Sequence, residues 1–435
     1  MARHGSHRRC IVDGWLAEKV QTQLGILAVS VEQRALGRMG MAGPRLRTNR
    51  SSTLPRVHKH PRRLEESNLL TLATPRIESA NVCAHRYVCD FVSFLVTPHE
   101  LSSAFRDAGT LQQGTVLSVE ITERMQTPIS KLWFLEVVYS PDAVPQLPNR
   151  LLLKWAHEQS AAPQRGDPEV VFYRDLAPLL SSPPMVQCFA TAPRTSAERW
   201  LIIEDLRSTH TNPPWPERPG DIEVHEAVAV LAQIHARWWE APALGSTIGV
   251  PHTETKLRTM VHGFRDHLPA FFNELGDDLP QSDRQVLEAV FNSSLQPWLR
   301  LVDPRALTVI HGDAHTWNFL FPRSGQGMPY LVDWQVWHLD LGARDLAFMI
   351  ALHWDRTARQ QLELSLLHRY HEELIKTGIV NYSFDDLFLD YRRCAVRNLT
   401  FPILFWSRGL PRSAWRNRLD CALAAYRDLD CAELI

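Results

Sequence analysis

The chain of 435 residues lacks the features that mark several large protein classes. No apolar run approaches the roughly 18 residues that span a bilayer, so we expect no transmembrane helix and no membrane partner. The N-terminal stretch holds no continuous apolar signal core. Its seven cysteines are odd in number and form no C-x-x-C pair, which disfavours a disulfide framework or a zinc site. We therefore expect reduced thiols in a cytoplasmic protein.

Several common catalytic signatures are also missing. The sequence contains no Walker A motif, no H-E-x-x-H, no G-x-S-x-G and no Rossmann glycine motif. These absences argue against P-loop enzymes, zinc proteases, α/β-hydrolases and dinucleotide-binding dehydrogenases. Any enzymatic chemistry must come from another constellation of residues.

Charge is distributed unevenly along the chain. Residues 1–63 contain 13 Lys and Arg but only three Asp and Glu. Subtracting these from the totals of 47 and 48 leaves a net charge of −11 on the remainder, so we expect no nucleic-acid partner. The basic composition and weak periodicity of residues 1–95 predict a disordered extension. A transit peptide would share this composition.

The rest of the chain is first β-rich and then α-rich. Alternating apolar residues predict strands at 116–123, 131–139, 151–156 and 199–206, with a helix at 167–180 between the last two. Helical spacing predicts further helices at 97–109, 221–240, 253–275, 281–301, 343–353, 357–377, 384–407 and 411–430. This order predicts an α+β fold of two lobes, over residues 96–206 and 207–435.

The stretch IHGDAHTWNFLF, residues 310–321, places Asp313 and Asn318 inside an apolar run. We expect a loop between short strands, followed by a turn and a returning strand in YLVDWQ (330–335). Asp313, Asn318 and Asp333 would then meet where the hairpin ends. Converging oxygen ligands suit Mg²⁺, a hard cation that shares its coordination shell with phosphates.

These segments resemble a known family. HGDAHTWN is similar to the catalytic loop, and VDWQ to the metal-binding motif, of the aminoglycoside phosphotransferase/choline kinase-like superfamily. The DWQ form, with EDL upstream, most resembles its ecdysteroid-kinase-like branch. The resemblance implies a two-lobed, protein-kinase-like fold with a small antiparallel β N-lobe and a larger helical C-lobe. It also implies that Asp313 accepts the proton of an acceptor hydroxyl and that Asn318 and Asp333 hold Mg²⁺.

The same resemblance assigns the ATP-binding parts. Lys154, in LLLKWA, would contact the α- and β-phosphates, and Glu169, which matches an E-x-x-F-Y pattern, would pair with it. The EDL segment, Glu204, Asp205 and Leu206, resembles the hinge, whose backbone would meet the adenine. Each assignment has a purely structural alternative. Lys154 could be a charged residue on an edge strand, Glu169 a solvated first-turn residue favoured by the helix dipole, and EDL an ordinary strand end.

Other matched positions concern structure rather than chemistry. We expect His235, in LAQIHARWW, to be a packed helix histidine, and Asp345, in LGARDLAF, to anchor the catalytic loop or cap a helix. The loop at 124–130 has no glycine, unlike the protein-kinase G-x-G-x-x-G loop, so the hydroxyls of Thr127 and Ser130 or backbone amides would have to serve the phosphates. This loop, and the lack of D-F-G and A-P-E segments, argue against a protein kinase.

The sequence therefore predicts an ATP- and Mg²⁺-dependent kinase acting on a hydroxyl of a small molecule. One alternative is a nucleotide-binding pseudokinase scaffold, suggested by the glycine-free loop and the basic extension. Another is a metal-dependent hydrolase, which leaves Lys154 unexplained; its ligands would be His311, Asp313, His315 and Asp333.

The acceptor and the assembly are less constrained. Large aromatic residues of the C-terminal half could line an acceptor pocket for a hydrophobic alcohol: Trp238, Trp239, Trp317, Trp337, Trp354, Phe405 and Trp406. No feature of the sequence predicts an oligomeric state.

Overall fold

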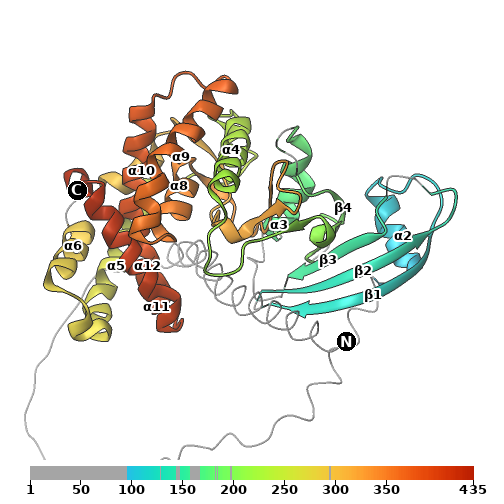
Figure 1. Ribbon diagram of the computed structural model, residues 1–435, viewed down its shortest axis with the longest axis horizontal. Coiled ribbons are helices and arrows are strands. Elements are labelled where there is room, and N and C mark those ends of the chain that lie inside the picture. Colours follow the sequence, from blue (N-terminus) through green and yellow to red (C-terminus); the bar gives the residue numbers. More distant parts are fainter. Residues whose placement is uncertain are drawn as a thin grey trace, which may run out of the picture.

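A computed structural model of the chain describes residues 96–127, 129–143, 147–156, 167–181, 183, 185–195, 198–292 and 295–435. The expected basic extension over residues 1–95 lies outside the described residues. Two lobes lie side by side, an antiparallel sheet on the right of Figure 1 and a group of helices on the left. The predicted α+β class, with a small β N-lobe and a larger helical C-lobe, is confirmed.

The N-lobe is built on a five-stranded sheet in the order β1-β2-β3-β5-β4, with antiparallel neighbours throughout. Its strands are β1 (Val116–Gln126), β2 (Ser130–Tyr139), β3 (Arg150–Ala156), β4 (Cys188–Thr191) and β5 (Trp200–Glu204). Helix α2 (Pro98–Asp107) packs against β1 and β4, and Thr97 Oγ1 caps it by accepting the Glu100 N–H. The predicted strands are confirmed, and β4 is an additional one.

The helix predicted at 167–180 changes geometry along its length. It begins as α3 (Pro168–Val171), continues as a π-helical segment over Phe172–Leu176 and ends as a 3₁₀ turn over Ala177–Leu179. The Asp167 carboxylate caps its start by accepting the Glu169 N–H at 2.9 Å. π-Helical segments occur frequently at functional sites, and this one begins three residues after Glu169.

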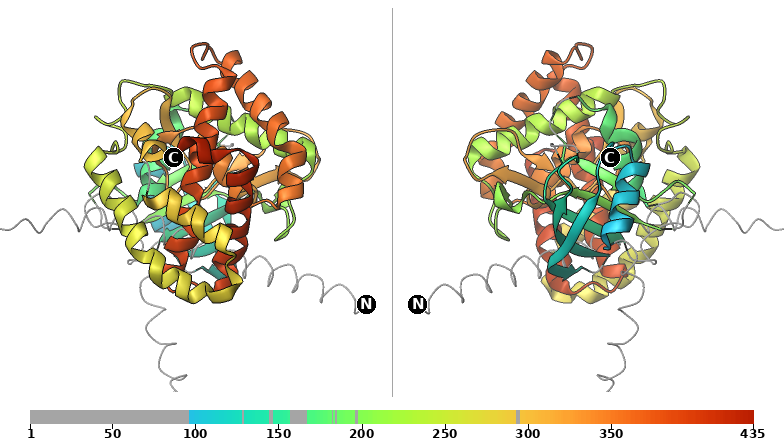
Figure 2. Two further views of the ribbon diagram at one scale, coloured as in Figure 1. Left: turned by 90° about the vertical axis from the view of Figure 1, so that its left-hand side faces the viewer. Right: turned by 90° about the vertical axis from the view of Figure 1, so that its right-hand side faces the viewer.

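The C-lobe consists mainly of helices. These are α4 (Asp221–Trp238), α5 (Glu254–Leu275), α6 (Gln281–Asn292), α7 (Gln296–Leu299), α8 (Ala343–Leu346), α9 (Arg356–Lys376), α10 (Phe384–Asn398), α11 (Thr400–Ser407) and α12 (Arg412–Asp428). Figure 2 shows α5, α6 and α12 at one end of the molecule and the sheet with α2 at the other. No helix in the described part of the chain is long and apolar enough to cross a membrane.

Two of the predicted helices were wrong in extent. The segment at 281–301 contains the separate helices α6 and α7, and the segment at 384–407 is divided at Leu399 into α10 and α11. Pro297 and Pro402 lie in the first turns of the second helix of each pair. Since proline has no N–H to donate to the preceding turn, a helix readily begins at such a residue but rarely continues through it.

Short strands carry the polar segments of the C-lobe. Strand β7 (Leu307–Ile310) pairs with β10 (His338–Leu341), and β8 (Phe319–Pro322) pairs with β9 (Tyr330–Leu331) and with β6 (His210–Thr211). Helix α4 contacts β7 and α9, and its apolar residues such as Val224, Val228 and Leu231 are buried. The loop after β7 and the segment after β9 are therefore held against the centre of the lobe.

Candidate active site

The loop after β7 and the segment after β9 meet at the open end of a hairpin. Phe319 pairs with Leu331, and the next pairing is a hydrogen bond from the Val332 N–H to the Asn318 carbonyl at 3.0 Å. His311 Nε2 donates to the Val332 carbonyl at 3.0 Å. This main-chain register brings Asn318 close to the residue that follows Val332, which is Asp333.

His311 orders the loop rather than facing a ligand. Its Nε2 carries the proton donated to Val332, so its Nδ1 is the acceptor for the Asp313 N–H at 3.2 Å. Both bonds require the neutral ring, and burial lowers the pKa of His311 accordingly. The side chain is fully buried.

Asp345 anchors the same loop from the N-terminal turn of α8. Its carboxylate accepts the His311 N–H at 2.8 Å and the Gly312 N–H at 2.9 Å, and His235 Nε2 lies 3.2 Å away. Burial by itself would raise the pKa of Asp345, but these bonds outweigh burial and lower it. His235 in turn contacts the Tyr370 hydroxyl at 2.8 Å. Asp345 and His235 therefore hold the loop in place and do not face a ligand.

Two glycines permit this close packing. Gly312 has φ +82°, and a Cβ there would lie 2.7 Å from the Val336 carbonyl oxygen. A Cβ on Gly342 would overlap the Tyr370 hydroxyl and approach His235 Nδ1 to 2.9 Å. Neither position can carry a side chain without displacing backbone or the buried His235–Tyr370 pair.

Asp313 and Asn318 are joined directly. Asn318 Nδ2 donates to the Asp313 carbonyl at 2.9 Å and to its Oδ2 at 3.2 Å. This geometry leaves Asn318 Oδ1 without a hydrogen-bond partner in the described part of the chain, so it is the atom that could bind a cation. Burial, together with the charge of Asp333, raises the pKa of Asp313 well above its ordinary value. The two carboxylates therefore lie close enough to repel each other.

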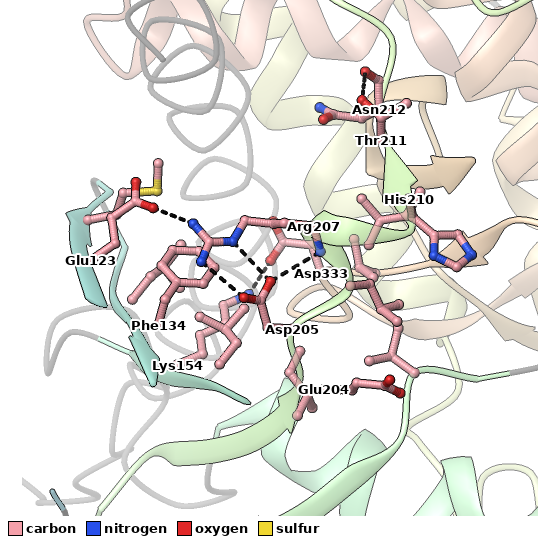
Figure 3. Close-up of a pocket in the computed structure, with 18 of the residues that line it drawn as sticks. Glu123, Phe134, Lys154, Glu204, Asp205, Arg207, His210, Thr211, Asn212 and Asp333 are labelled. Carbon is pink, nitrogen blue, oxygen red and sulfur yellow. Dashed lines mark hydrogen bonds and ion pairs between the residues drawn. The ribbon is translucent and has the colours of Figure 1, made fainter. Parts of the chain in front are cut away.

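Lys154 bridges two buried carboxylates, those of Glu169 and Asp333; Figure 3 labels Lys154 and Asp333. Its Nζ lies 2.7 Å from Glu169 Oε2 and 2.5 Å from Asp333 Oδ1, and all three side chains are at most 7% exposed. Burial alone would lower the pKa of Lys154, but the two carboxylates outweigh it and raise that pKa. Burial raises the pKa of Glu169 to about 7, although Lys154 opposes this. Three sequence-predicted residues from three elements thus form one cluster.

The segment containing Asp333 is fixed against α3. The rings of Phe172 and Trp334 stack with centroids 3.7 Å apart and planes 5° from parallel. Gln335 Nε2 contacts Glu169 Oε2 at 3.4 Å, and Trp337 Nε1 donates to the Pro168 carbonyl at 2.7 Å. These contacts explain why the E-x-x-F-Y and D-W-Q patterns occur in one chain, since each supplies the packing partner of the other.

A pocket of about 330 Å³ opens beside Lys154. Strands β1–β3 and β5 line it on one side, and Leu320, Val332 and Asp333 on the other. Glu204, Asp205 and Leu206 lie along its edge. The Leu206 N–H has no hydrogen-bond partner in the described residues, whereas the Glu204 N–H donates to the Gln187 carbonyl at 3.0 Å. This pocket thus combines apolar walls with a vacant backbone donor at Leu206.

Arg207 in this pocket was missed by the sequence reasoning. Its guanidinium carbon lies 3.3 Å from the centroid of the Phe134 ring. Its Nε donates to Asp205 Oδ1 at 2.9 Å, and its Nη1 pairs with Glu123 on β1 (Figure 3). Its position directly after EDL was the available signal, but only the fold shows that it reaches across to β1.

The predicted phosphate contacts of Thr127 and Ser130 are not supported. Their hydroxyl oxygens lie 3.0 Å apart, and Thr127 Oγ1 also accepts the Ser130 N–H at 2.9 Å. Both residues are buried. The hydroxyls therefore close the β1–β2 turn and are not presented to a ligand.

The described residues contain no group of three or more His, Cys, Asp or Glu that could hold a metal ion. His315 Nε2 is 3.6 Å from Asp313 Oδ2. A closed site made only of such ligands, as the hydrolase hypothesis requires, is thus not formed there. One carboxylate and one amide oxygen, from Asp333 and Asn318, fit Mg²⁺, which usually takes few protein ligands and completes its shell with water and phosphate.

The suggested aromatic pocket wall divides into separate groups. Trp238 packs in the core face of α4, and Trp337 is docked on α3. Trp317 and Phe405 lie near the loop that carries Asp313, through contacts with His315 and Arg418 respectively. Of the suggested aromatic residues, Trp317 and Phe405 therefore lie near the candidate base, whereas Trp238 and Trp337 pack elsewhere.

Comparison with known proteins adds one direct finding. The model of the phosphotransferase enzyme family (APH) matches residues 142–380, more than half of the chain. No curated protein sequence matches significantly. Similar solved structures include a macrolide 2'-phosphotransferase from Brachybacterium faecium, 15% identical over 70% of this chain and 91% of that chain, with a TM-score of 0.43.

A choline kinase from Cryptosporidium parvum Iowa II is 12% identical over 73% of this chain and 91% of that chain, with a TM-score of 0.45. Since these TM-scores lie below 0.5, the assignment depends on the family match. That match spans Lys154, Glu169, the Asp313–Asn318 loop and Asp333. The chain belongs to the phosphotransferase enzyme family.

Proposed function

We propose that this protein is an ATP- and Mg²⁺-dependent kinase that transfers the γ-phosphate to a hydroxyl group of a small molecule. The observation that carries the proposal is the Lys154 bridge between Glu169 and Asp333, next to the loop that presents Asp313 and Asn318. A lysine–glutamate pair, a metal-binding aspartate and a base followed by an asparagine are the recurring parts of kinase active sites.

The pocket between the lobes supports nucleotide binding. Its apolar walls would hold the adenine, with the vacant Leu206 N–H as the hinge donor. The segment at 204–206 would then act through its backbone, because the Asp205 carboxylate is already engaged by Arg207 and Arg150. Lys154 would contact the phosphates from the inner end of the pocket.

The residues that would hold Mg²⁺ are Asp333, through its carboxylate, and Asn318, through its Oδ1. Bound there, Mg²⁺ would compensate the negative charge of the triphosphate and that which develops during transfer. Asp333 is kept in place from two sides, by Lys154 and by the stacked Phe172–Trp334 rings next to it. Positioning and charge compensation of this kind are the main contributions to phosphoryl transfer.

Asp313 would accept the acceptor's hydroxyl proton as the oxygen attacks the γ-phosphorus. Its carboxylate is oriented by the Asn318 amide, and its backbone by His311. The raised pKa of Asp313 reflects burial beside Asp333, so positive charge brought to the site would favour the ionised base. The DWQ and EDL segments support placement in the ecdysteroid-kinase-like branch.

The lobe boundary is proposed near residue 206, where the hinge-like segment ends. The four cysteines in the described residues, Cys188, Cys394, Cys421 and Cys431, form no disulfide, which supports the proposed cytoplasmic location.

An untargeted screen tests this function. The full chain is incubated with ATP, Mg²⁺ and a metabolite extract, and mass spectrometry records compounds that gain one phosphate. We expect phosphorylated products with the wild type and none with Asp313→Ala. A product that persists with Asp313→Ala would contradict the assignment of the base.

The pseudokinase scaffold remains the second candidate because the β1–β2 turn offers no glycine and no accessible hydroxyl for the phosphates. It differs from the kinase in one measurable respect. A scaffold would bind Mg²⁺ and ATP without phosphorylating any compound of the extract, whereas any acceptor turned over by the wild type alone would exclude it.

A further inference from the structure

A cluster of unpartnered polar groups lies beside Asp313, among residues that do not line Lys154's pocket. Within the described part of the chain, both ring nitrogens of His315, the Thr316 hydroxyl and Trp354 Nε1 are buried without a hydrogen-bond partner. His315 Nε2 faces Asp313 Oδ2 at 3.6 Å. Because buried polar atoms in folded proteins are nearly always satisfied, several in one place beside a candidate base indicate groups that bind a ligand.

Arg418 from α12 brings a positive charge to this cluster. The residue is only 6% exposed, and the contacts that it makes within the described residues include no carboxylate. Its Nη1 donates to the Ala414 carbonyl on its own helix, and its Nε lies 3.3 Å from His353 Nε2. Nη2 has no hydrogen-bond partner among the residues described. A buried, unpaired guanidinium is costly to keep, so its counter-charge is expected from a ligand.

Neighbouring groups hold Arg418 without neutralising it. His353 Nδ1 donates to the Phe348 carbonyl at 2.7 Å, so its Nε2 is the acceptor for Arg418 and the ring is neutral. Burial lowers the pKa of Arg418 to about 10, with only partial opposition from the charge of Asp313. The guanidinium therefore stays charged at neutral pH.

Aromatic side chains surround these polar groups. The His315 ring lies 5.3 Å from Trp317 and 5.5 Å from His353, and the Arg418 guanidinium carbon lies 5.6 Å from the Phe405 centroid. Trp215 packs on Trp317 with centroids 4.2 Å apart. The cluster thus combines aromatic side chains with one cation, Arg418, and two histidines, of which His315 lies next to the candidate base.

We propose that this cluster is the acceptor subsite and that it selects a hydroxylated compound with an apolar body and a carboxylate, which binds Arg418 and His315. The inference rests on the proposed function, since it names the acceptor class of the same site. A guanidinium donates to a carboxylate through charge-assisted hydrogen bonds, and it repels a cationic amine. Cationic acceptors are therefore disfavoured here.

A competing explanation gives Arg418 a purely internal task, the support of the Asp313 charge. That explanation predicts no discrimination between acceptors of different charge. It also predicts that loss of Arg418 changes the pH dependence of turnover for every acceptor alike. Binding of ligands that differ only in charge separates the two explanations, whereas the activity of an Arg418 variant alone does not.

The test uses three probes that share a phenyl ring and a hydroxyl: 3-phenyllactate, its neutral amide 3-phenyllactamide, and the cationic 1-amino-3-phenylpropan-2-ol. Binding to the full chain is followed by tryptophan fluorescence, since Trp215 and Trp317 lie at the cluster. We expect 3-phenyllactate to bind about 10- to 100-fold more tightly than the amide, as one charge-assisted contact permits. The amine should bind most weakly.

Three variants sharpen the test. Arg418→Met should abolish the preference for the carboxylate, and Arg418→Lys should keep part of it. Arg427→Met is the matched control on the same helix, because Arg427 pairs with Asp283 at the surface, and it should leave the preference unchanged. Arg418→Met should still fold, because replacing a buried charge by an apolar side chain is often neutral or stabilising; its thermal unfolding is measured in parallel.

The result that overturns the inference is clear-cut. Equal or weaker binding of 3-phenyllactate, no binding of it at millimolar concentration, or a preference that survives Arg418→Met would each contradict it. The binding assay needs no ATP, so its outcome is independent of turnover. Failure of phosphorylation with selective carboxylate binding would contradict the proposed function alone, and phosphorylation confined to neutral or cationic compounds would contradict this inference alone.

Discussion

Lys154 Nζ lies 2.5 Å from Asp333 Oδ1, and this buried ion pair joins the N-lobe sheet to the C-lobe segment after β9. The same nitrogen contacts Glu169 on α3. One cation thus neutralises two carboxylates and ties three elements together. The proposed ligands, a triphosphate and Mg²⁺, would interact with these same groups, so binding and inter-lobe cohesion are coupled through Lys154.

Replacement of Lys154 should therefore lower stability as well as activity. Lys154→Met leaves Glu169 and Asp333 buried without their counter-charge, and we expect a loss of about 3–5 kcal/mol in the free energy of unfolding. The double variant Lys154→Met/Glu169→Gln should recover part of that loss. Urea denaturation measures both. Lys131→Met on β2 is the control, with an expected change within about 0.5 kcal/mol; a Lys154→Met variant as stable as this control would contradict the account.

The stacked pair of Phe172 and Trp334 should show measurable coupling. A double-mutant cycle with Phe172→Leu and Trp334→Leu should give an interaction energy of about 0.5–1.5 kcal/mol beyond the separate losses of packing. Since Trp334 follows Asp333 directly, Trp334→Leu should also reduce phosphoryl transfer. The control cycle pairs Phe172→Leu with Trp298→Leu, a buried tryptophan elsewhere in the core. Equal coupling in the two cycles would refute the specific role of the stack.

Glu169 should make the stability of the empty protein depend on pH. Burial raises the pKa of Glu169 from 4.5 to about 7 in the folded state. The folded state therefore binds this proton more tightly than the unfolded state, and the stabilising contribution is complete below about pH 4.5 and lost as the pH rises through about 7. The unfolding free energy of the wild type relative to Glu169→Gln should fall across this window. A flat difference would show that folding leaves the pKa of Glu169 unchanged, and a rising difference that folding lowers it; either result would contradict this prediction.

Asp345 should affect turnover through the loop it anchors. Asp345→Asn replaces one acceptor oxygen by a donor, so one of the N–H groups of His311 and Gly312 loses its partner, at a cost of about 1–3 kcal/mol in stability. We expect kcat to fall at least tenfold while KM for ATP changes little. Asp303→Asn, in an exposed ion pair with Arg305, is the control. A change in KM for ATP alone would place Asp345 in nucleotide binding instead.

Much of the site could be predicted because its chemistry is ordered along the sequence. Lys154 ends an apolar strand, Glu169 opens a helix, and Asp313 and Asn318 interrupt an apolar run, so each is conspicuous where it stands. The structure brings Lys154, Glu169 and Asp333 within hydrogen-bonding distance. Their contact could be anticipated from the motif pattern, although 179 residues separate Lys154 from Asp333.

Other features depend on tertiary packing and left no local signal. Nothing in the periodicity distinguishes Arg418 from the other arginines of α12, and only the fold shows that it is buried without a carboxylate. The stacking of Phe172 on Trp334 is likewise a long-range contact. Because the loop at 124–130 has no glycine, the sequence offered the hydroxyls of Thr127 and Ser130, or backbone amides, as phosphate contacts, whereas the tight turn uses these hydroxyls internally. A local sequence pattern does not show which polar groups form hydrogen bonds within a turn and are therefore not available to a ligand.

The most direct test of the central claim follows the γ-phosphoryl group itself. ATP labelled at the γ-phosphorus is incubated with Mg²⁺, a hydroxylated-metabolite fraction and either the wild type or Asp313→Asn, while ATP binding is measured for both proteins. The account predicts that label enters a small organic molecule with the wild type. It also predicts that Asp313→Asn binds ATP equally well but transfers label about 10²- to 10⁴-fold more slowly, the contribution expected of a general base. Transfer by Asp313→Asn at the wild-type rate, with the acceptor present, would contradict it.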